Sequence, residues 1–269
     1  MEFFTRQFKG KHFRIYPLGD WHYGSRPCHE AFIAQVVAEI KADPDAVWVG
    51  MGDFIENAII GSKSDIYTQT VPPREQMDHI VDLLTPIKSK GLFIVGGNHE
   101  ARTMRLVGIQ PESYIAARLD LPFMGFSCYA TLYTRADQSG THAGHWRGFA
   151  CYFHHNTGGG VTPGGKVNAA EKLRLIAPTA DAIFSAHTHT TARTPFTWYE
   201  TGKASVIKKT GYDYTIGSAL TWNGSYAEEK RCPPATVEHV KVTFIGGTSG
   251  KVDNRQQIYE IISPKPTEG

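Results

Sequence analysis

The chain has 269 residues, of which 41% are hydrophobic and 20% charged, and its formal net charge is +2. These proportions are ordinary for a soluble globular protein, and the charge is too small to identify nucleic acid or a membrane as the partner. No stretch approaches the ~20 apolar residues that a membrane-spanning helix needs, and the first eleven residues resemble no signal peptide. With four cysteines and no CxxC pair, we expect a cytoplasmic protein with reduced thiols and no membrane contact.

Apolar runs and amphipathic segments alternate over the first hundred residues. Residues 13–18, 46–49 and 91–95 are short apolar runs that predict buried strands. Between them, residues 30–41 and 75–90 carry apolar side chains at helical spacing, which predicts two helices. This order is typical of β-α-β units with a parallel sheet.

Each of these three strands is followed by a glycine and then by side chains that bind metals. The first strand leads to Asp20 and His22, the second to Asp53, and the third to Asn98 and His99. Ligands in open α/β sheets usually bind at the carboxyl ends of the strands. We therefore expect these side chains to lie together at one edge of a sheet.

The second half of the chain repeats the pattern and then changes. A short helix is expected over 112–119, an antiparallel region over 121–147 and a strand over 148–153, which ends at His154 and His155. A glycine-rich loop, a helix over 167–177 and a strand over 181–184 follow. We find no linker and no internal repeat, so we predict one domain over 1–269, with a β-rich C-terminal extension at about 195–263.

His187 and His189 follow the strand predicted at 181–184. Residues two apart on a strand point the same way, so both imidazoles would face one point. Carboxylate and imidazole together suit divalent Mn, Fe, Co, Ni or Zn better than calcium or copper(I). Six of the twelve histidines fall at or just after strand ends: His22, His99, His154, His155, His187 and His189.

The number of these groups indicates two metal ions. Seven or eight candidate ligands are too many for one ion that keeps an open position, whereas two ions can share them if one carboxylate bridges. Two divalent ions roughly 4 Å apart can acidify a water and neutralise phosphate oxygens during displacement at phosphorus. The sequence therefore points to phosphoester chemistry.

The order of the motifs resembles that of the calcineurin-like metallophosphoesterases, whose pattern is DxH, GDxx, GNH[DE], H and GHxH. The matching segments are Asp20-Trp21-His22, Gly52-Asp53, Gly97-Asn98-His99-Glu100, a histidine at a strand end, and Ala186-His187-Thr188-His189. They cover residues 13–193, and Ala186 replaces the usual glycine. Each motif is weak alone, but five in order are specific.

The resemblance implies a fold and a set of roles. The fold would be a four-layer α/β/β/α sandwich of two mixed β-sheets flanked by helices. The cofactors would be two divalent transition-metal ions, with manganese preferred and iron, nickel, cobalt and zinc as alternatives. Asp20, His22 and His189 would hold the first ion; Asn98, His187 and the fourth-motif histidine would hold the second; Asp53 would bridge them.

His99 would be a general acid, and the adjacent Glu100 has the chemistry to orient its ring. We expect His154 to be the fourth-motif ligand because it directly ends the strand, with His155 facing the substrate or supporting the ligands. Lys166 follows the glycine-rich loop, which could present N–H groups to a phosphate or could equally be a flexible turn. The further candidates for phosphate contact are Arg102 and Arg193.

The substrate is less clearly indicated. Protein phosphatases of the family carry Asp-Arg-Gly after the second motif, whereas this chain has Asp53-Phe54-Ile55-Glu56-Asn57. The sequence also resembles bacteriophage phosphoesterases, which are often placed near DNA repair nucleases. We expect a phosphodiesterase acting on DNA, RNA or nucleotides, with a small-molecule phosphomonoesterase or a non-catalytic scaffold as alternatives. Oligomeric state is left open.

Overall fold

The computed structural model describes residues 1–62, 64–135, 145–202, 205–229, 231–234, 236–247 and 253–266, and for residues 226 and 227 the backbone alone. The first half contains β1 (Glu2–Gln7), β2 (His12–Leu18), α1 (Glu30–Ala42), β3 (Ala46–Gly50), α2 (Pro73–Leu84), the 3₁₀ helix η1 (Thr85–Lys90), β4 (Gly91–Ile94), α3 (Ala101–Val107) and α4 (Pro111–Arg118). The second half contains β5 (Ser127–Arg135), β6 (Trp146–His154), α5 (Pro163–Glu171), the 3₁₀ helix η2 (Lys172–Leu175), β7 (Ala182–Ser185), β8 (Thr191–Thr201), β9 (Val206–Ser218), α6 (Tyr226–Glu229), β10 (Glu238–Ile245) and β11 (Gln256–Ile262).

The strands form two mixed halves that are joined at one seam. One half contains β1, β5, β6, β7, β9 and β8, and the other contains β11, β10, β2, β3 and β4. The halves are hydrogen-bonded where β9 meets β10, through the pairs Ser218–Glu238 and Gly217–His239. Strands β2, β3 and β4 are mutually parallel, and so are β6, β7 and β9.

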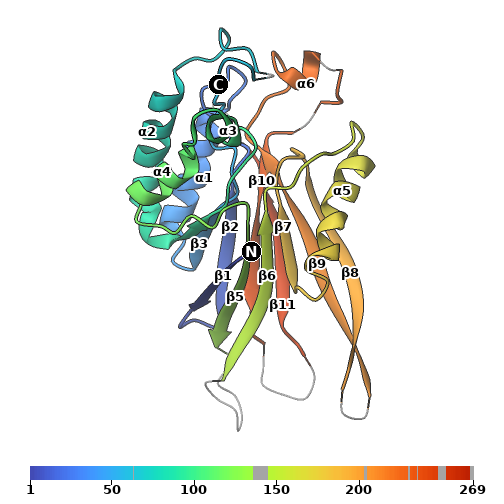
Figure 1. The fold of residues 1–269 in the computed structure, drawn as a ribbon. Helices are drawn as coiled ribbons and strands as arrows, with labels where there is room; N and C mark the ends of the chain where they lie inside the picture. Colours follow the sequence, from blue (N-terminus) through green and yellow to red (C-terminus); the bar gives the residue numbers. More distant parts are fainter. Residues whose placement is uncertain are drawn as a thin grey trace.

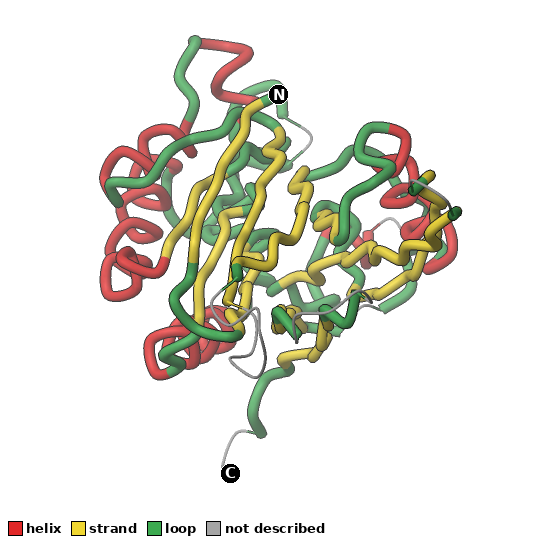
Figure 2. The backbone as a smooth tube through the Cα atoms, turned by 90° about the horizontal axis from the view of Figure 1, so that it is seen from below, coloured by secondary structure: helices red, strands yellow, loops and turns green. Residues whose placement is uncertain are grey.

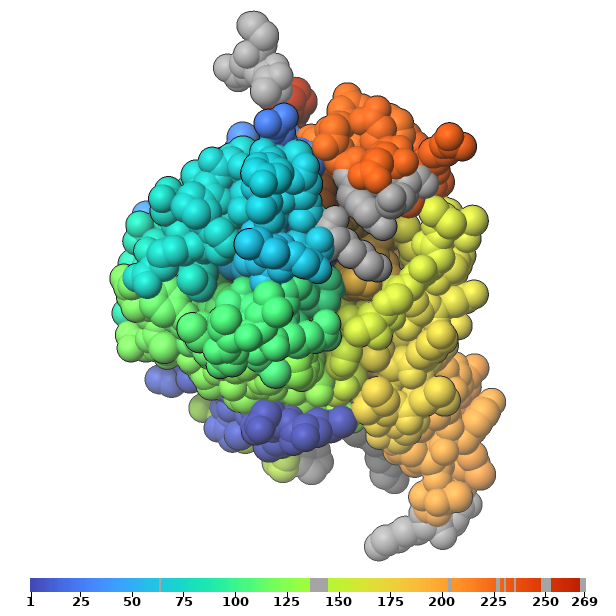
Figure 3. Space-filling model, turned by 45° about the horizontal axis from the view of Figure 1, so that its top comes forward, coloured from blue at the N-terminus to red at the C-terminus, as the bar shows by residue number. Residues whose placement is uncertain are grey.

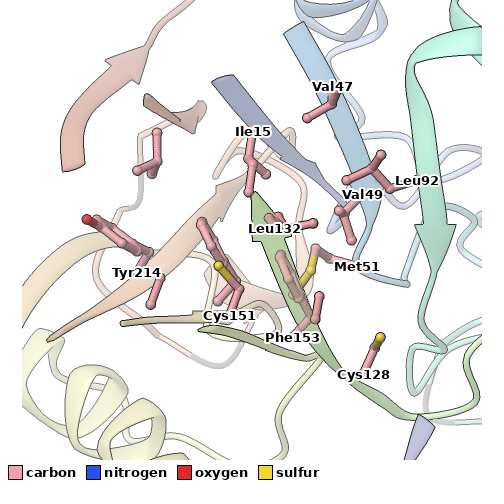
Figure 4. Close-up of a cluster of buried hydrophobic side chains, with 14 of the residues drawn as sticks. Ile15, Val47, Val49, Met51, Leu92, Cys128, Leu132, Cys151, Phe153 and Tyr214 are labelled. Atoms are coloured by element: carbon pink, nitrogen blue, oxygen red, sulfur yellow. The ribbon is translucent and has the colours of Figure 1, made fainter. Parts of the chain in front are cut away.

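The two halves pack face to face, with helices on both outer sides (Figures 1 and 2). Alternate residues of each strand, such as Ile15, Val49 and Phe153, enter the core between the sheets (Figure 4). The opposite face of β2–β4 packs on α1, α2 and α4, while the opposite face of β6 and β7 packs against the segment that follows α5. The expected α/β fold with a mixed sheet flanked by helices is confirmed.

Several elements differ from the sequence-based expectation. The helix expected over 75–90 ends at Leu84 and continues as η1, because Pro86 lacks the N–H that an α-helix requires. The elements that were not expected include β1, α3, α6 and the part of β8 before residue 195. The C-terminal strands join the main sheet, since β10 lies between β9 and β2. Within the described residues, no helix has the length and hydropathy of a membrane span.

Candidate metal centre

Parallel strands deliver the motif side chains to one end of the molecule. Residues after β2, β3 and β4 leave neighbouring strands of one sheet half, and those after β6 and β7 leave neighbouring strands of the other. The carboxyl ends of parallel strands lie at the same edge, so the loops meet between the two halves. Figure 3 shows this end as a hollow bordered by separate segments of the chain.

Five of the motif residues adopt the left-handed backbone conformation that non-glycine residues rarely use. Their φ angles are 51° at Asp20, 48° at His22, 51° at Asp53, 70° at His187 and 51° at His189. Such conformations cost on the order of 1–3 kcal/mol each and persist where the surroundings enforce them. Here the N–H groups of Asp20 and His22 donate to the carbonyls of Gly52 and Asp53, so the loops hold one another.

Glycines allow the second and third motif loops to touch. A Cβ on Gly52, where φ is +81°, would lie 2.3 Å from the Gly97 nitrogen. A Cβ on Gly97 would lie 2.2 Å from the Asp53 carboxylate. Both motifs therefore need a glycine because larger residues would separate the loops that carry Asp53 and Asn98.

Asp20, His22 and His189 form the first potential ligand group. The His22 and His189 Nε2 atoms lie 3.1 Å apart, and Asp20 Oδ1 is 3.6 Å from His189 Nε2. Asp20 Oδ2 accepts the His187 N–H at 2.8 Å, while the buried Oδ1 has no hydrogen-bond partner. An unpartnered buried carboxylate oxygen is costly unless a cation satisfies it, so this group fits a metal ion.

Asp53, His155 and His187 form the second group. His155 Nε2 lies 3.2 Å from Asp53 Oδ2 and 3.0 Å from Asn98 Oδ1. Its Nδ1 donates to the Met51 carbonyl at 2.7 Å. That hydrogen bond fixes the ring so that Nε2 faces the site, as in other metal-binding histidines.

Asp53 lies between the two groups. Its Oδ2 atom is 3.2 Å from His155 Nε2 on one side and 3.9 Å from His22 Nε2 on the other. Its Oδ1 atom accepts the His99 N–H at 2.8 Å. One carboxylate oxygen therefore faces ligands of both groups.

The expectation for the fourth motif is corrected, because the structure brings His155 rather than His154 into the cluster. Side chains alternate along β6, so Phe153 enters the core between the sheets and Tyr152 faces the opposite way. His154 points with Tyr152, and its ring lies 6.2 Å from the Tyr152 ring. His155 follows Phe153 to the inner side, where Asp53 lies.

Glu100 also differs from its expected role. Its fully buried carboxylate accepts the N–H groups of Asp53 at 3.0 Å and Ile55 at 3.2 Å, rather than orienting the His99 ring. Another buried carboxylate, that of Glu112, accepts the Gly97 N–H at 2.6 Å. These two side chains hold the loop backbones under the site.

Glu56 takes the position that we had expected of Glu100. His99 Nδ1 donates to the Glu56 carbonyl at 2.8 Å, so its Nε2 faces Asp53 Oδ2 at 3.9 Å. The Glu56 carboxylate lies 3.5 Å from His22 Nδ1 and 3.7 Å from His99 Nδ1. The sequence signal for Glu56 is its position three residues after Asp53, in the loop of the second motif.

The three cationic candidates for phosphate contact have different surroundings. Arg102 donates to the Glu56 carbonyl at 3.1 Å and to Ser64 Oγ at 3.0 Å. Arg193 lies on β8 with its guanidinium 3.8 Å from the centre of the Tyr212 ring. Lys166 is half-buried in the first part of α5. The structure therefore connects only Arg102 to the residues around His99.

Burial and neighbouring charges lower the pKa of some ionisable groups in the cluster and raise that of others. Burial lowers the pKa of His99 and of His187 to about 4, which leaves both rings neutral near pH 7. Burial also opposes the charged form of His155, but Asp53 and Asp20 outweigh it and raise its pKa to about 9. Burial raises the pKa of Asp20 to about 7. A bound cation would stabilise the carboxylates and take the place of the His155 proton.

The family model for calcineurin-like phosphoesterases matches residues 13–191, a span that holds every residue of this cluster. The chain belongs to the calcineurin-like phosphoesterase family. This confirms the family predicted from the motifs and makes the chain a metal-dependent phosphoesterase by family. Its metal-binding character agrees with the two groups described above and with a third, overlapping group of His22, Asp53 and His99.

No curated protein sequence gives a significant match. The solved structures that match include two of low similarity. One is a conserved uncharacterized protein, a predicted phosphoesterase, from Streptococcus pneumoniae TIGR4, with 11% identity, 93% of this chain and 98% of that chain covered, and a TM-score of 0.36. The other is Vps29 complexed with zinc from Entamoeba histolytica, with 13% identity, the same coverages and a TM-score of 0.38. At these values neither one bears on substrate or metal.

Proposed function

We propose that this phosphoesterase binds two divalent transition-metal ions and hydrolyses phosphodiester bonds in nucleic acids or nucleotides. The first ion would be held by Asp20, His22 and His189, the second by Asn98, His155 and His187, and Asp53 would be shared. Carboxylate, amide and imidazole donors suit manganese, with iron, cobalt, nickel and zinc as alternatives.

The placement of Asp53 carries this proposal. One carboxylate oxygen that lies 3.2 Å from a ligand atom of one group and 3.9 Å from a ligand atom of the other supports a bridging role. When bound, a pair of such ions supplies an acidified water and neutralises phosphate oxygens. The protein supplies fixed ligand positions, because the Asp53 backbone is held by Glu100.

His99 would move the proton that the leaving oxygen needs. Its Nδ1–H is held by the Glu56 carbonyl, so a proton taken up at Nε2 is directed into the site. Burial lowers the pKa of His99, whereas the nearby Glu56 carboxylate favours the charged ring. A ring that holds and releases a proton in this way can act as a general acid.

Charge around the site favours a diester over a monoester. A phosphomonoester carries a charge of about −1.5 to −2 near pH 7, whereas a diester carries a single charge. The monoester would benefit from a free guanidinium next to the metal ligands, but the guanidinium of Arg102 is engaged by Glu56 and Ser64. This observation supports the diester.

The test compares bis(p-nitrophenyl) phosphate with p-nitrophenyl phosphate at equal Mn(II) concentration. We expect a higher kcat/KM for the diester, and loss of both activities in Asp53→Asn. A strong preference for the monoester would contradict the diester assignment, while full activity in Asp53→Asn would contradict the site itself. Plasmid and single-stranded DNA then distinguish a nuclease from a diesterase that acts on small molecules.

A further inference from the structure

The hairpin of β8 and β9 leaves one of its two faces uncovered. Figure 1 shows this hairpin extending past the other strands, and Figure 3 shows it projecting from the body. Residues directly opposite in an antiparallel pair share a face, and Arg193 is opposite Tyr214, a residue of the core between the sheets. Alternate positions that follow this pair toward the tip of the hairpin continue the same inner face, and they lie away from Gly217 and Ser218, where β9 pairs with β10.

We name these positions the hairpin face. They are Arg193, Pro195, Thr197, Tyr199 and Thr201 of β8 and Val206, Lys208, Thr210 and Tyr212 of β9. All of them are exposed except Tyr212, which is half-buried. The side chain of Tyr199 is 68% exposed, which is unusual for a large aromatic residue.

The chemistry of the hairpin face is aromatic and cationic. It carries Arg193 and Lys208 and no carboxylate among its nine positions, whereas Glu200 lies on the opposite face beside Trp198. Tyr199 is directly opposite Lys208, so an aromatic and a cationic residue occupy paired positions on this face. The guanidinium of Arg193, stacked at 3.8 Å on the Tyr212 ring, presents a second flat cationic surface.

A groove of about 420 Å³ adjoins this face. Lys208, Thr210 and Tyr212 line it from β9, and Gln256, Gln257 and Ile258 line it from β11. Its other charged groups offset one another: Arg255 pairs with Asp181 and Asp253, and Lys209 lies 3.4 Å from Asp253. These two acidic and two basic groups cancel in formal charge, so Lys208 gives the lining of the groove a net positive charge.

This surface begins beside the metal centre. Strand β8 starts at Thr191, two residues after His189. The strand rises about 3.3 Å per residue, so Arg193 to Tyr199 span roughly 20 Å leading away from the site. A polymer whose phosphodiester lies at the metal centre could follow this face, whereas a small substrate could not.

We propose that the hairpin face binds single-stranded nucleic acid that extends from the metal centre, which rests on the proposed phosphodiesterase function. Exposed tyrosines accept stacked bases, and nearby cations hold the backbone phosphates, without preference for sequence. A single strand is favoured over a duplex because its bases are free to stack. DNA and RNA share this chemistry, so both are tested.

The experiment measures binding of fluorescein-labelled oligo-dT and oligo-U by anisotropy, using the full chain in EDTA so that no substrate is cleaved. We expect binding that weakens with salt, and a loss of fivefold or more in the double variant Tyr199→Ala/Lys208→Ala. The matched control, Tyr67→Ala/Lys41→Ala, removes an exposed tyrosine and an exposed lysine elsewhere and should bind as the wild type does. Thermal melting establishes that both variants are folded.

Three results would overturn the inference: no oligonucleotide binding at low salt, equal losses in the two double variants, or tighter binding of a duplex than of either single strand. Hydrolysis of bis(p-nitrophenyl) phosphate by the wild type is measured in parallel. Diesterase activity without oligonucleotide binding refutes the hairpin face and leaves the proposed function standing. Oligonucleotide binding without diesterase activity refutes the proposed function and leaves the hairpin face standing as a binding surface.

Discussion

Protonation of His239 should control the acid stability of the fold. This buried ring accepts the Trp21 indole N–H at Nε2, at 3.0 Å, and donates from Nδ1 to the Ile216 carbonyl, also at 3.0 Å. A second proton on Nε2 would face the indole N–H and break that contact. Burial accordingly lowers the pKa of His239 from 6.5 to about 4.

The sign and size of the effect follow from this shift. Between pH 6.5 and 4 the unfolded chain binds a proton at this residue that the folded chain does not, so stability falls as the pH falls through this window. Each pH unit within it is worth about 1.4 kcal/mol, which gives about 2.5 kcal/mol between pH 7.5 and pH 4.5.

The variant His239→Gln isolates this contribution. Glutamine can accept from Trp21 and donate to Ile216 but does not titrate. We would measure urea unfolding of both metal-free proteins from pH 7.5 to 4.5. The wild type should lose about 2.5 kcal/mol relative to the variant, because other titrating groups cancel in the difference. A difference that is independent of pH would refute the reasoning, whatever its constant value.

Three further predictions concern the metal centre. His155→Ala should lose bound metal by elemental analysis, whereas the matched variant His154→Ala should keep it; metal loss in His154→Ala alone would restore the original assignment. Asp53→Asn should lose metal and nearly all turnover, since a neutral amide bridges poorly, and retention of two ions per chain would contradict this. His99→Ala should keep its metal but slow turnover by about 10²–10⁴-fold, and reduced metal content would show that His99 is a ligand.

Much of the fold could be predicted because its central strands are continuous apolar runs, of which those of β2, β3 and β4 lead directly to glycine. The same property concealed the choice between His154 and His155. Residues 149–153 of β6 are nearly all apolar, since this strand is covered on both faces, and alternation cannot show which face is which. Which face of β6 points toward the other sheet is decided by how the two halves pack, and the local sequence does not contain that information.

The local sequence of the unexpected elements indicates their secondary structure only weakly. β1 is polar and mostly exposed, and its order comes from parallel pairing with β5, more than a hundred residues away. α3 leaves Leu106 and Val107 exposed, so it lacks an amphipathic pattern. β8 contains Pro195, which a central strand would not accept but an edge strand does.

Glu100 and Glu56 show how sequence adjacency differs from contact. Glu100 follows His99 in the chain, yet its carboxylate turns under the loop to hold Asp53 and Ile55. Glu56 is 43 residues from His99, yet its carbonyl fixes the ring. Because the Asp53 loop is held by Glu100 and in turn supplies Glu56 to His99, one segment positions both the proposed bridging ligand and the proposed proton donor. A change that shifts this segment should therefore alter metal binding and proton transfer together, whereas a change at His99 alone should affect only the second.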